Sequence, residues 1–491
     1  MKIPGIAISL LMLLSHSSAV FAQIPAVSGD ICAVDLGAKI DAIANRAEFS
    51  RSRWGILIQP LSSPTTLYSR DSQKYFIPAS NVKLLTTAAA LQKLGADFRI
   101  KTSVYSGENG NLHIVGRGDP SIAEAQLKSL AQQLKQRISR VNELIGDDSY
   151  FQGNAVNPNW EWEDAQAGYG APINSLIFNQ NAIELILSPQ AIGQPLKVTF
   201  AQPKLINQWQ IQNNSVTVGQ NESEFVEVGR EFDKPILRVS GQLRVGAESE
   251  SAYVAVVNPA NNFLQHFQQV LAAEGIAVKQ ALVASNSRIF TQELANIESP
   301  PLAELVKETN RESNNVYAEV LLRLLGKETG KMPVPQEQET GKMPVSQEQD
   351  TMKVGLKELQ TTLTQLGINP NTYKLADGSG LSRHNLISPE ALVQTLRLMA
   401  NSPLASIYRA SLPVAGESGT LKNRFLTPNR VILQAKTGTL SGVSVLSGYL
   451  EVPNYEPLVF SIMVNQSDLS APKVRSAIDE IVLLLNRLSR C

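Results

Sequence analysis

The sequence predicts an α+β fold in which an antiparallel sheet is flanked by helices and a smaller α+β region is inserted into the chain. Apolar and polar residues alternate as in strands at 443–450 and 458–465, and a helical pattern follows at 473–488. Residues 101–286 consist mainly of short strand patterns separated by turns. Strands and helices that are grouped along the chain in this way are typical of the α+β class.

Length and composition limit which classes of protein the chain can belong to. With 491 residues the chain is long enough for two or three domains. It carries 44 Lys and Arg against 44 Asp and Glu, so the charge balance does not indicate a partner that is a nucleic acid. No Cys-x-x-Cys or His-Glu-x-x-His motif occurs, and we expect neither a metal site nor a cofactor.

Residues 1–22 have the pattern of an export signal. Lys2 precedes an apolar run at 3–14, and small residues around Ala22 form a cleavage site before Gln23. An uncleaved membrane anchor is the alternative, but the run is too short to span a bilayer. We therefore expect an exported mature chain without a transmembrane segment, located in the periplasm or cell envelope.

The first elements after the signal are a helix and two strands. Apolar residues at helical spacing predict a helix over 33–48, and strand patterns follow at 54–58 and 66–68. Pro78 stands where a helix begins and Gly95 where one ends, so a further helix is predicted between them.

An inserted region begins after this helix. Strand patterns at 101–106 and 111–115 flank a Gly- and Asn-containing turn and predict a hairpin, and a helix is expected over 122–141. Further predicted elements are strands at 182–188, 197–201, 236–240 and 252–257 and a helix at 263–274. We expect 101–286 to form two α+β subdomains inserted into one domain made of 23–100 and 287–491.

A tandem repeat interrupts the second part of that domain. The segment ETGKMPVPQEQ at 328–338 is nearly copied at 339–349. Its Pro, Gln and Glu content cannot build a core, so 328–349 is predicted to be a surface loop without a catalytic part. Helical patterns surround it at 302–326, 352–366 and 389–399.

Ser80-Asn81-Val82-Lys83 is the first candidate for catalysis. Residues three apart share a helix face, so the Lys83 ammonium reaches the Ser80 hydroxyl. The N–H of Ser80, at the helix start, has no partner within the helix and is available for developing negative charge. A second Ser-x-x-Lys occurs at 470–473, where Ser470 is better explained as the cap of the last helix.

Two further motifs complete a known set. Ser313-Asn314-Asn315 is the only Ser-x-Asn in the chain, and Lys436-Thr437-Gly438 is the only Lys-Thr-Gly. In this order, the three motifs resemble those of penicillin-binding proteins and serine β-lactamases. The resemblance implies a transpeptidase-like domain with the antiparallel sheet and helices expected above.

Other segments narrow the resemblance to one family. The chain resembles the D-alanyl-D-alanine carboxypeptidase/endopeptidase family, the low-molecular-mass class C penicillin-binding proteins of peptidase family S13. The long insertion between Ser80 and Ser313 is similar to that of the family, whereas the tandem repeat is a departure from it. The segments that carry the resemblance are 116–120 (GRGDP), 169–172 (YGAP), 313–319, 377–383 (DGSGLSR), 412–416 and 419–421.

The resemblance implies roles for the motif residues. Ser80 would attack the carbonyl carbon of a D-Ala-D-Ala bond, and Lys83 would take its proton. Ser313 would relay that proton to the leaving amine, Asn315 would hold Lys83 and the substrate amide, and Lys436 would lower the pKa of Lys83.

The strand motif would bind the substrate. Lys436, Thr437, Gly438 and Thr439 would hold the terminal carboxylate, and the backbone N–H groups of Ser80 and Thr439 would form the oxyanion hole. The implied substrates are peptidoglycan stem peptides or their cross-links, and β-lactams would be inhibitors that acylate Ser80.

Other functions remain open on the sequence alone. A β-lactamase or esterase-like hydrolase would use the same residues and differ in its deacylation rate. A catalytically silent wall-binding protein is disfavoured because a binder does not need Ser80, Lys83, Ser313 and Lys436 together. A Ser-His-Asp site is disfavoured because no histidine of the mature chain accompanies a Gly-x-Ser-x-Gly motif.

The two cysteines lie at opposite ends of the mature chain. Cys32 and Cys491 are a candidate disulfide in an oxidising compartment, provided that the termini meet. Two unpaired thiols are the alternative.

Overall fold

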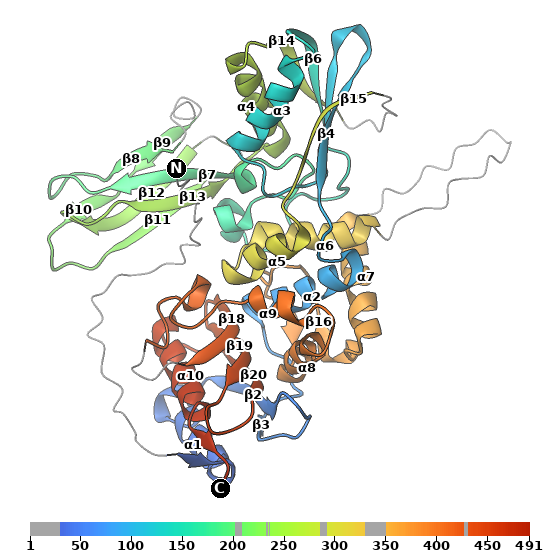
Figure 1. Ribbon diagram of the computed structural model, residues 1–491. Coiled ribbons are helices and arrows are strands. Elements are labelled where there is room, and N and C mark those ends of the chain that lie inside the picture. Colours follow the sequence, from blue (N-terminus) through green and yellow to red (C-terminus); the bar gives the residue numbers. More distant parts are fainter. Residues whose placement is uncertain are drawn as a thin grey trace. The chain divides into compact units, whose positions relative to one another are not determined.

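The computed structural model describes residues 30–201, 209–231, 234, 236–284, 292–328, 350–426 and 431–491 (Figure 1). The expected export signal at 1–22 and residues 329–349 of the tandem repeat lie outside this range. The chain forms two compact units. One contains residues 100–299, and the other contains the described residues before and after that stretch.

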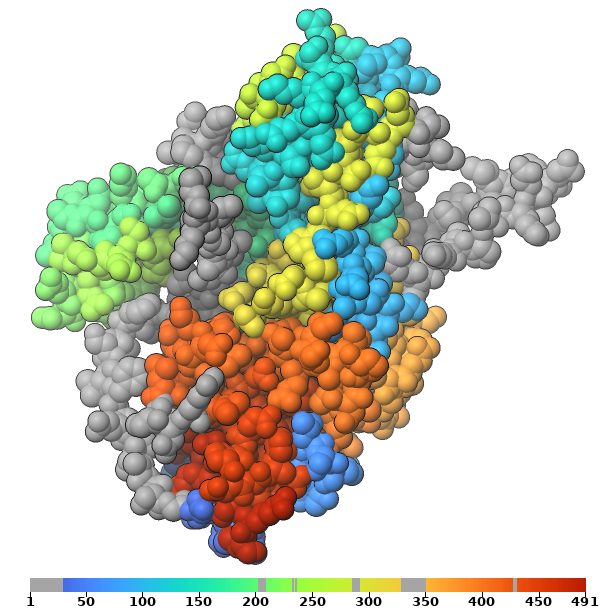
Figure 2. Space-filling model, viewed as in Figure 1, coloured from blue at the N-terminus to red at the C-terminus, as the bar shows by residue number. Residues whose placement is uncertain are grey.

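The unit formed by the two ends of the chain is built on a five-stranded antiparallel sheet, in the order β18-β19-β20-β2-β3. The strands are β18 (Ile432–Leu440), β19 (Val443–Glu451), β20 (Leu458–Asn465), β2 (Arg53–Pro60) and β3 (Tyr68–Arg70). Because β2 pairs with β20, the N-terminal part of the chain lies beside the C-terminal part, as the blue and red surfaces of Figure 2 show.

Two terminal helices contribute to the core of this unit. α1 (Ala33–Ala44) and α10 (Ala471–Leu485) contact each other, and their buried faces join one apolar cluster with strands β2, β18, β19 and β20. The helix expected over 33–48 ends at Ala44, because a separate 3₁₀ turn follows at Ala47–Phe49. The short strands β1 (Ile31–Cys32) and β21 (Leu488–Ser489) pair in parallel and bring the two ends of the described chain together.

A group of helices surrounds α2 (Val82–Leu94), which is buried at every position from Val82 to Leu91. Helices α5, α6, α7 and α8 all contact it. Their bounds, with those of the short α9, are α5 (Leu302–Arg311), α6 (Asn315–Glu328), α7 (Thr351–Leu366), α8 (Pro389–Ala400) and α9 (Ala405–Ala410).

The single helix expected over 302–326 is wrong in one respect. The chain leaves the helix after Arg311 and enters the next at Asn315. Between them Ser313 has a φ of 60°, in the left-handed region that a helix cannot contain. The break therefore falls at the first residue of the Ser-x-Asn motif.

The other unit contains a mixed sheet in the order β14-β6-β5-β4-β15. Its strands are β4 (Lys101–Ser106), β5 (Leu112–Val115), β6 (Arg140–Asp147), β14 (Ala277–Ala284) and β15 (Glu293–Glu298). Helices α3 (Glu124–Lys135) and α4 (Pro259–Ala273) share its apolar core. Because β15 pairs with β4, this unit extends to Ser299, beyond the expected end at 286.

The helix expected over 122–141 is too long. It ends at Lys135, and residues 140–147 form β6, which lies between β5 and β14 and pairs in parallel with both. Val141 and Leu144 of β6 are buried in the core that α3 also contacts. Pairing on both sides and this burial favour the strand over a continued helix.

A second group of strands in the same unit forms two sheets. The first has the order β13-β7-β8, and in the second β12 pairs with β9, β10 and β11. Side chains from both sheets meet in two small apolar clusters. The strands are β7 (Ala182–Ser188), β8 (Lys197–Phe200), β9 (Gln210–Asn213), β10 (Val216–Val218), β11 (Phe225–Arg230), β12 (Ile236–Arg244) and β13 (Glu250–Ala255).

Candidate active site

Ser80 lies in a 3₁₀ turn, Ala79–Asn81, directly before α2. The preceding residue, Ala79, has a φ of 46°, a conformation that is unfavourable for a residue with a Cβ. Ser80 is half-buried, and its neighbours from Asn81 onward are buried. The turn thus fixes Ser80 at the start of the central helix with its hydroxyl still accessible.

Lys83 is completely buried one turn after Ser80. Its Nζ donates hydrogen bonds to Ser80 Oγ at 3.0 Å, Asn315 Oδ1 at 2.6 Å and the carbonyl oxygen of Ser379 at 2.7 Å. Burial lowers the pKa of Lys83 to about 7, although nearby carboxylates act in the opposite direction. A substantial fraction of Lys83 is therefore neutral near pH 7 and able to accept a proton.

A second lysine and serine form a similar pair. Lys436, on β18, donates from Nζ to Ser313 Oγ at 2.8 Å and to the carbonyl oxygen of Thr437 at 3.0 Å. The pKa of Lys436 is lowered well below its usual value, first by burial and second by the charge of Lys83. The three sequence motifs are thus brought together at one place.

Strand β18 is an edge strand, and it packs against the turn that carries Ser80. A Cβ added to Gly438 would lie 2.9 Å from the carbonyl oxygen of Pro78 and 3.1 Å from Cβ of Ala79. Asn81 also donates from Nδ2 to the carbonyl oxygen of Lys436 at 3.3 Å. Glycine at 438 therefore permits the close approach of the strand motif to Ser80.

Thr439 lies near the end of β18. Leu440 pairs with Val443 across a two-residue turn and closes the β18–β19 hairpin. Leu440 and Val443 exchange hydrogen bonds in such a hairpin. The N–H of Thr439, the residue before Leu440, therefore points to the outer edge of β18. The N–H of Ala435, four residues before Thr439 on the same strand, points to the same edge and donates there to the carbonyl oxygen of Pro413.

Ser379 is part of the site, although its motif predicts no role for it and its segment, 377–383, only contributes to the family resemblance. The Ser379 carbonyl oxygen accepts from Lys83, and its N–H donates to the buried carboxylate of Glu319. A run such as Asp377-Gly378-Ser379-Gly380 predicts a turn, but only the fold shows which group the turn faces.

The second Ser-x-x-Lys lies elsewhere. Ser470 occupies the N-cap position of α10, as expected, but its side chain does not cap an amide there. Lys473 forms an ion pair with Glu48 at 3.7 Å. This motif therefore lies at the start of α10 and has no part in the cluster around Ser80.

Within the described ranges, no group of three or more His, Cys, Asp or Glu side chains is arranged to hold a metal ion. The same part of the chain has no helix that is long and apolar enough to cross a membrane.

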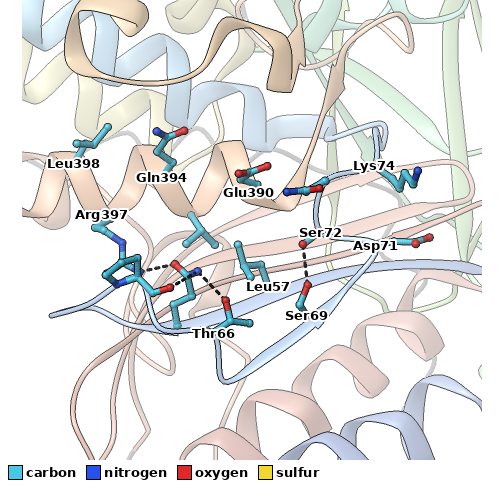
Figure 3. Close-up of a pocket in the computed structure, with 14 residues that line it drawn as sticks. Leu57, Thr66, Ser69, Asp71, Ser72, Lys74, Glu390, Gln394, Arg397 and Leu398 are labelled. Carbon is cyan, nitrogen blue, oxygen red and sulfur yellow. Dashed lines mark hydrogen bonds between the residues drawn. The ribbon is translucent and has the colours of Figure 1, made fainter.

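A groove of about 710 Å³ lies between β2, β3 and α8 (Figure 3). Leu57 and Thr66 line one side of it, and Glu390 and Gln394 of α8 line the other. Arg397 donates to the carbonyl oxygens of Pro60, Leu61 and Ser63 and so holds the loop after β2. None of the residues that line the groove belongs to the three motifs.

The two cysteines lie together. Cys32 and Cys491 form a disulfide with their Cα atoms 5.6 Å apart. The bond lies beside the β1–β21 pair and joins residues separated by 459 positions in the sequence.

Comparisons with known proteins agree with this arrangement. The profile of the D-Ala-D-Ala carboxypeptidase 3 (S13) family matches residues 36–487. A D-alanyl-D-alanine carboxypeptidase from an Actinomadura species is 32% identical over 462 residues, which cover 89% of this chain and 82% of that protein. Penicillin-sensitive carboxypeptidase A from Dictyostelium discoideum is 28% identical, and the match covers 92% of each protein.

A solved structure has the same fold. Penicillin binding protein 4 from Haemophilus influenzae matches with a TM-score of 0.75 and 24% identity, over 92% of this chain and 99% of that one. The match confirms the predicted α+β class with a penicillin-binding-protein-like domain. The chain therefore belongs to the D-Ala-D-Ala carboxypeptidase 3 (S13) family and is an enzyme of that type.

Proposed function

We propose that Ser80 is the nucleophile of a D-Ala-D-Ala peptidase and that Lys83 is its general base. The observation that carries this proposal is the 3.0 Å contact between Lys83 Nζ and Ser80 Oγ, made by a lysine whose pKa is lowered to about 7. A nucleophilic serine needs a base within hydrogen-bond reach that is partly neutral at the working pH.

Acylation follows from this geometry. Neutral Lys83 takes the proton of Ser80 as Oγ forms a bond to the carbonyl carbon of the D-Ala-D-Ala peptide. The N–H groups of Ser80 and Thr439 stabilise the oxyanion that forms, since one belongs to the turn before α2 and the other points to the outer edge of β18. Two such donors are the usual minimum for this purpose.

Breakdown of the tetrahedral intermediate requires a proton for the leaving amine. Ser313, whose hydroxyl is held at 2.8 Å by Lys436, relays the proton that Lys83 took from Ser80: its hydroxyl gives a proton to the amine nitrogen and regains one from protonated Lys83. The C–N bond breaks, D-Ala leaves as an amine, and the acyl group stays on Ser80. Asn315 holds Lys83 at 2.6 Å throughout and so keeps the base aligned.

The strand motif is suited to the terminal carboxylate of the substrate. Thr437 and Thr439 offer hydroxyls along β18, and Lys436 precedes them on the same strand. Water then hydrolyses the acyl-enzyme. A β-lactam resembles the same peptide and would acylate Ser80, in agreement with the name of the penicillin-sensitive relative from Dictyostelium.

The substrates we propose are peptidoglycan stem peptides and their D-Ala-containing cross-links. The pattern of residues 1–22 supports export to the periplasm or cell envelope, where this polymer lies. Trimming of free stem peptides and cleavage of cross-links both break a bond after a D-Ala carbonyl, so one site can serve both reactions.

The test uses purified muropeptides. Mature enzyme and the Ser80→Ala variant are incubated with a monomeric pentapeptide muropeptide and with a cross-linked dimer. The products are separated by chromatography and identified by mass spectrometry. Loss of one D-Ala from the monomer shows carboxypeptidase activity, and conversion of the dimer to monomers shows endopeptidase activity. Cleavage of neither substrate, or equal cleavage by the variant, would contradict the proposal.

A further inference from the structure

Two carboxylates lie buried beside the site, and neither belongs to the three motifs. Glu319, on α6, has no exposed surface, and neither has Asp377 in the turn that precedes Leu381. Glu319 stands one helical turn after Asn315, so both residues lie on the face of α6 that looks toward α2. Burying two carboxylates is costly unless each is fully hydrogen-bonded.

Their partners are the backbone amides of one turn. Glu319 Oε1 accepts from the N–H groups of Gly378 at 2.8 Å and Ser379 at 2.9 Å. Asp377 accepts from the N–H groups of Gly380 at 2.7 Å and Ser382 at 2.6 Å. The side chains of Glu319 and Asp377 thus fix four of the five backbone amides of residues 378–382.

The turn held in this way contacts both members of the catalytic pair. Its Ser379 carbonyl oxygen accepts from Lys83 Nζ at 2.7 Å. Gly380 lies directly against the peptide before Ser80, because a Cβ at 380 would be only 1.9 Å from the carbonyl oxygen of Ala79. The hydrogen bond from Lys83 to Ser379 and the packing of Gly380 against the Ala79–Ser80 peptide therefore both depend on the position of this turn.

We propose that Glu319 is a positioning residue for the Ser80–Lys83 pair. Its carboxylate holds the Gly378 and Ser379 amides, and the turn then presents the Ser379 carbonyl oxygen to Lys83 and packs Gly380 against the Ala79–Ser80 peptide. This inference rests on the proposed roles of Ser80 and Lys83 and assigns a further residue to the same reaction.

Glu319 also acts on Lys83 through its charge. Three charged groups face Glu319: Arg323 of α6 at 3.3 Å, Asp377 of the turn and Lys83 of α2. The charge of Asp350 acts in turn on Arg323 and raises its pKa against the effect of burial. Negative charge on Glu319 raises the pKa of Lys83 against the effect of burial. Burial and the charge of Asp377 raise the pKa of Glu319 itself to about 7, so little of this charge remains below that pH, and its removal should leave the acidic limb of the pH–rate profile nearly unchanged.

The experiment separates the hydrogen-bond acceptor from the charge. A single change at Glu319 would leave Arg323 buried without its partner, so both residues are changed together. The E319Q/R323M variant keeps an oxygen for the two amides, and the E319L/R323M variant does not. D479N is the control for the loss of an ion pair elsewhere in the unit. It breaks the ion pair between Arg424 and Asp479, of which Asp479 lies on α10.

The readout is the second-order rate constant for acylation by a fluorescent penicillin between pH 5 and 9, measured well below each Tm. We expect E319Q/R323M to acylate near the wild-type plateau rate and E319L/R323M to be about 10- to 100-fold slower, since small misplacements of reacting groups cost this much. Both should keep the acidic limb of the pH–rate profile close to that of the wild type, and D479N should change neither the rate nor the limb.

Equal rate constants for the two double variants would overturn the proposal, whether both were fast or both slow. If a double variant does not fold, the single variants E319Q and E319L carry the same comparison of acceptor present against acceptor absent, and equal acylation rate constants for these two would overturn the proposal. Failure of the proposed function is distinct, because the wild-type enzyme would then not be acylated at Ser80.

Discussion

Lys83 and Lys436 are both completely buried, and the charge of Lys83 lowers the pKa of Lys436. Each lysine holds a different serine, Lys83 that of the first motif and Lys436 that of the second. Two ammonium groups in one dry site repel each other, so proton loss is favoured there. The site thus contains, in Lys83, an amine with a pKa near neutrality, and it does so without a histidine.

The pH dependence of acylation follows from Lys83. The base must be neutral to accept the Ser80 proton, and its pKa is lowered to about 7. We expect the rate of acylation by penicillin to rise about tenfold per pH unit below that pKa and to level off above it. Stopped-flow fluorescence over pH 5–9 measures this, and a rate that falls as the pH rises through 7 would contradict the assignment.

Lys436→Ala should slow acylation without unfolding the protein. The change removes the donor that holds the Ser313 hydroxyl. Losses of about 100- to 1,000-fold are typical for one such group. The matched control is Lys473→Ala, from the other Ser-x-x-Lys, which loses only a half-exposed ion pair with Glu48. Equal rates for the two variants would remove Lys436 from the mechanism.

The Cys32–Cys491 bond should stabilise the protein without affecting catalysis. It closes a loop that spans 459 positions, and removal of a native disulfide typically costs about 2–5 kcal/mol. We expect C32S/C491S to have a Tm lower by several degrees and an unchanged acylation rate at 25 °C. Differential scanning fluorimetry with and without a reductant checks this, and a reductant-insensitive wild-type Tm would contradict it.

Deleting residues 339–349 should leave acylation unchanged. This segment is the second copy of the tandem repeat, and its composition offers no core or catalytic group. One copy still connects α6 to α7, and loop length has only a weak effect on stability. A large loss of the acylation rate constant in the deletion variant would show that the repeat has a part in function.

The sequence predicted which motif residues the fold brings together better than it predicted the path of the chain. Ser80, Lys83, Ser313 and Lys436 were identifiable because their motifs are short and local. The helix break at Ser313 was missed because apolar residues at helical spacing flank it on both sides, although Ser and Asn favour caps and turns over helix interiors.

Two other features also depend on tertiary structure. Residues 140–147 became a strand because β5 and β14 pair with them on both sides, which no local pattern reveals. Glu319 and Ser379 lie 60 positions apart and contact each other only in the fold, where the Ser379 carbonyl also reaches Lys83. Backbone groups in particular leave no mark in a sequence, so contributions such as that of Ser379 emerge only from structure.

The most direct measurement of the central claim is intact-mass analysis of the mature protein and Ser80→Ala during incubation with a fluorescent penicillin. We predict one adduct on the wild-type chain, located at Ser80 by peptide mapping, and none on the folded variant. An adduct that forms and is quickly lost with release of hydrolysed drug would favour a β-lactamase. An adduct on the variant, or none on the wild-type protein, would contradict the assignment of Ser80 as the nucleophile.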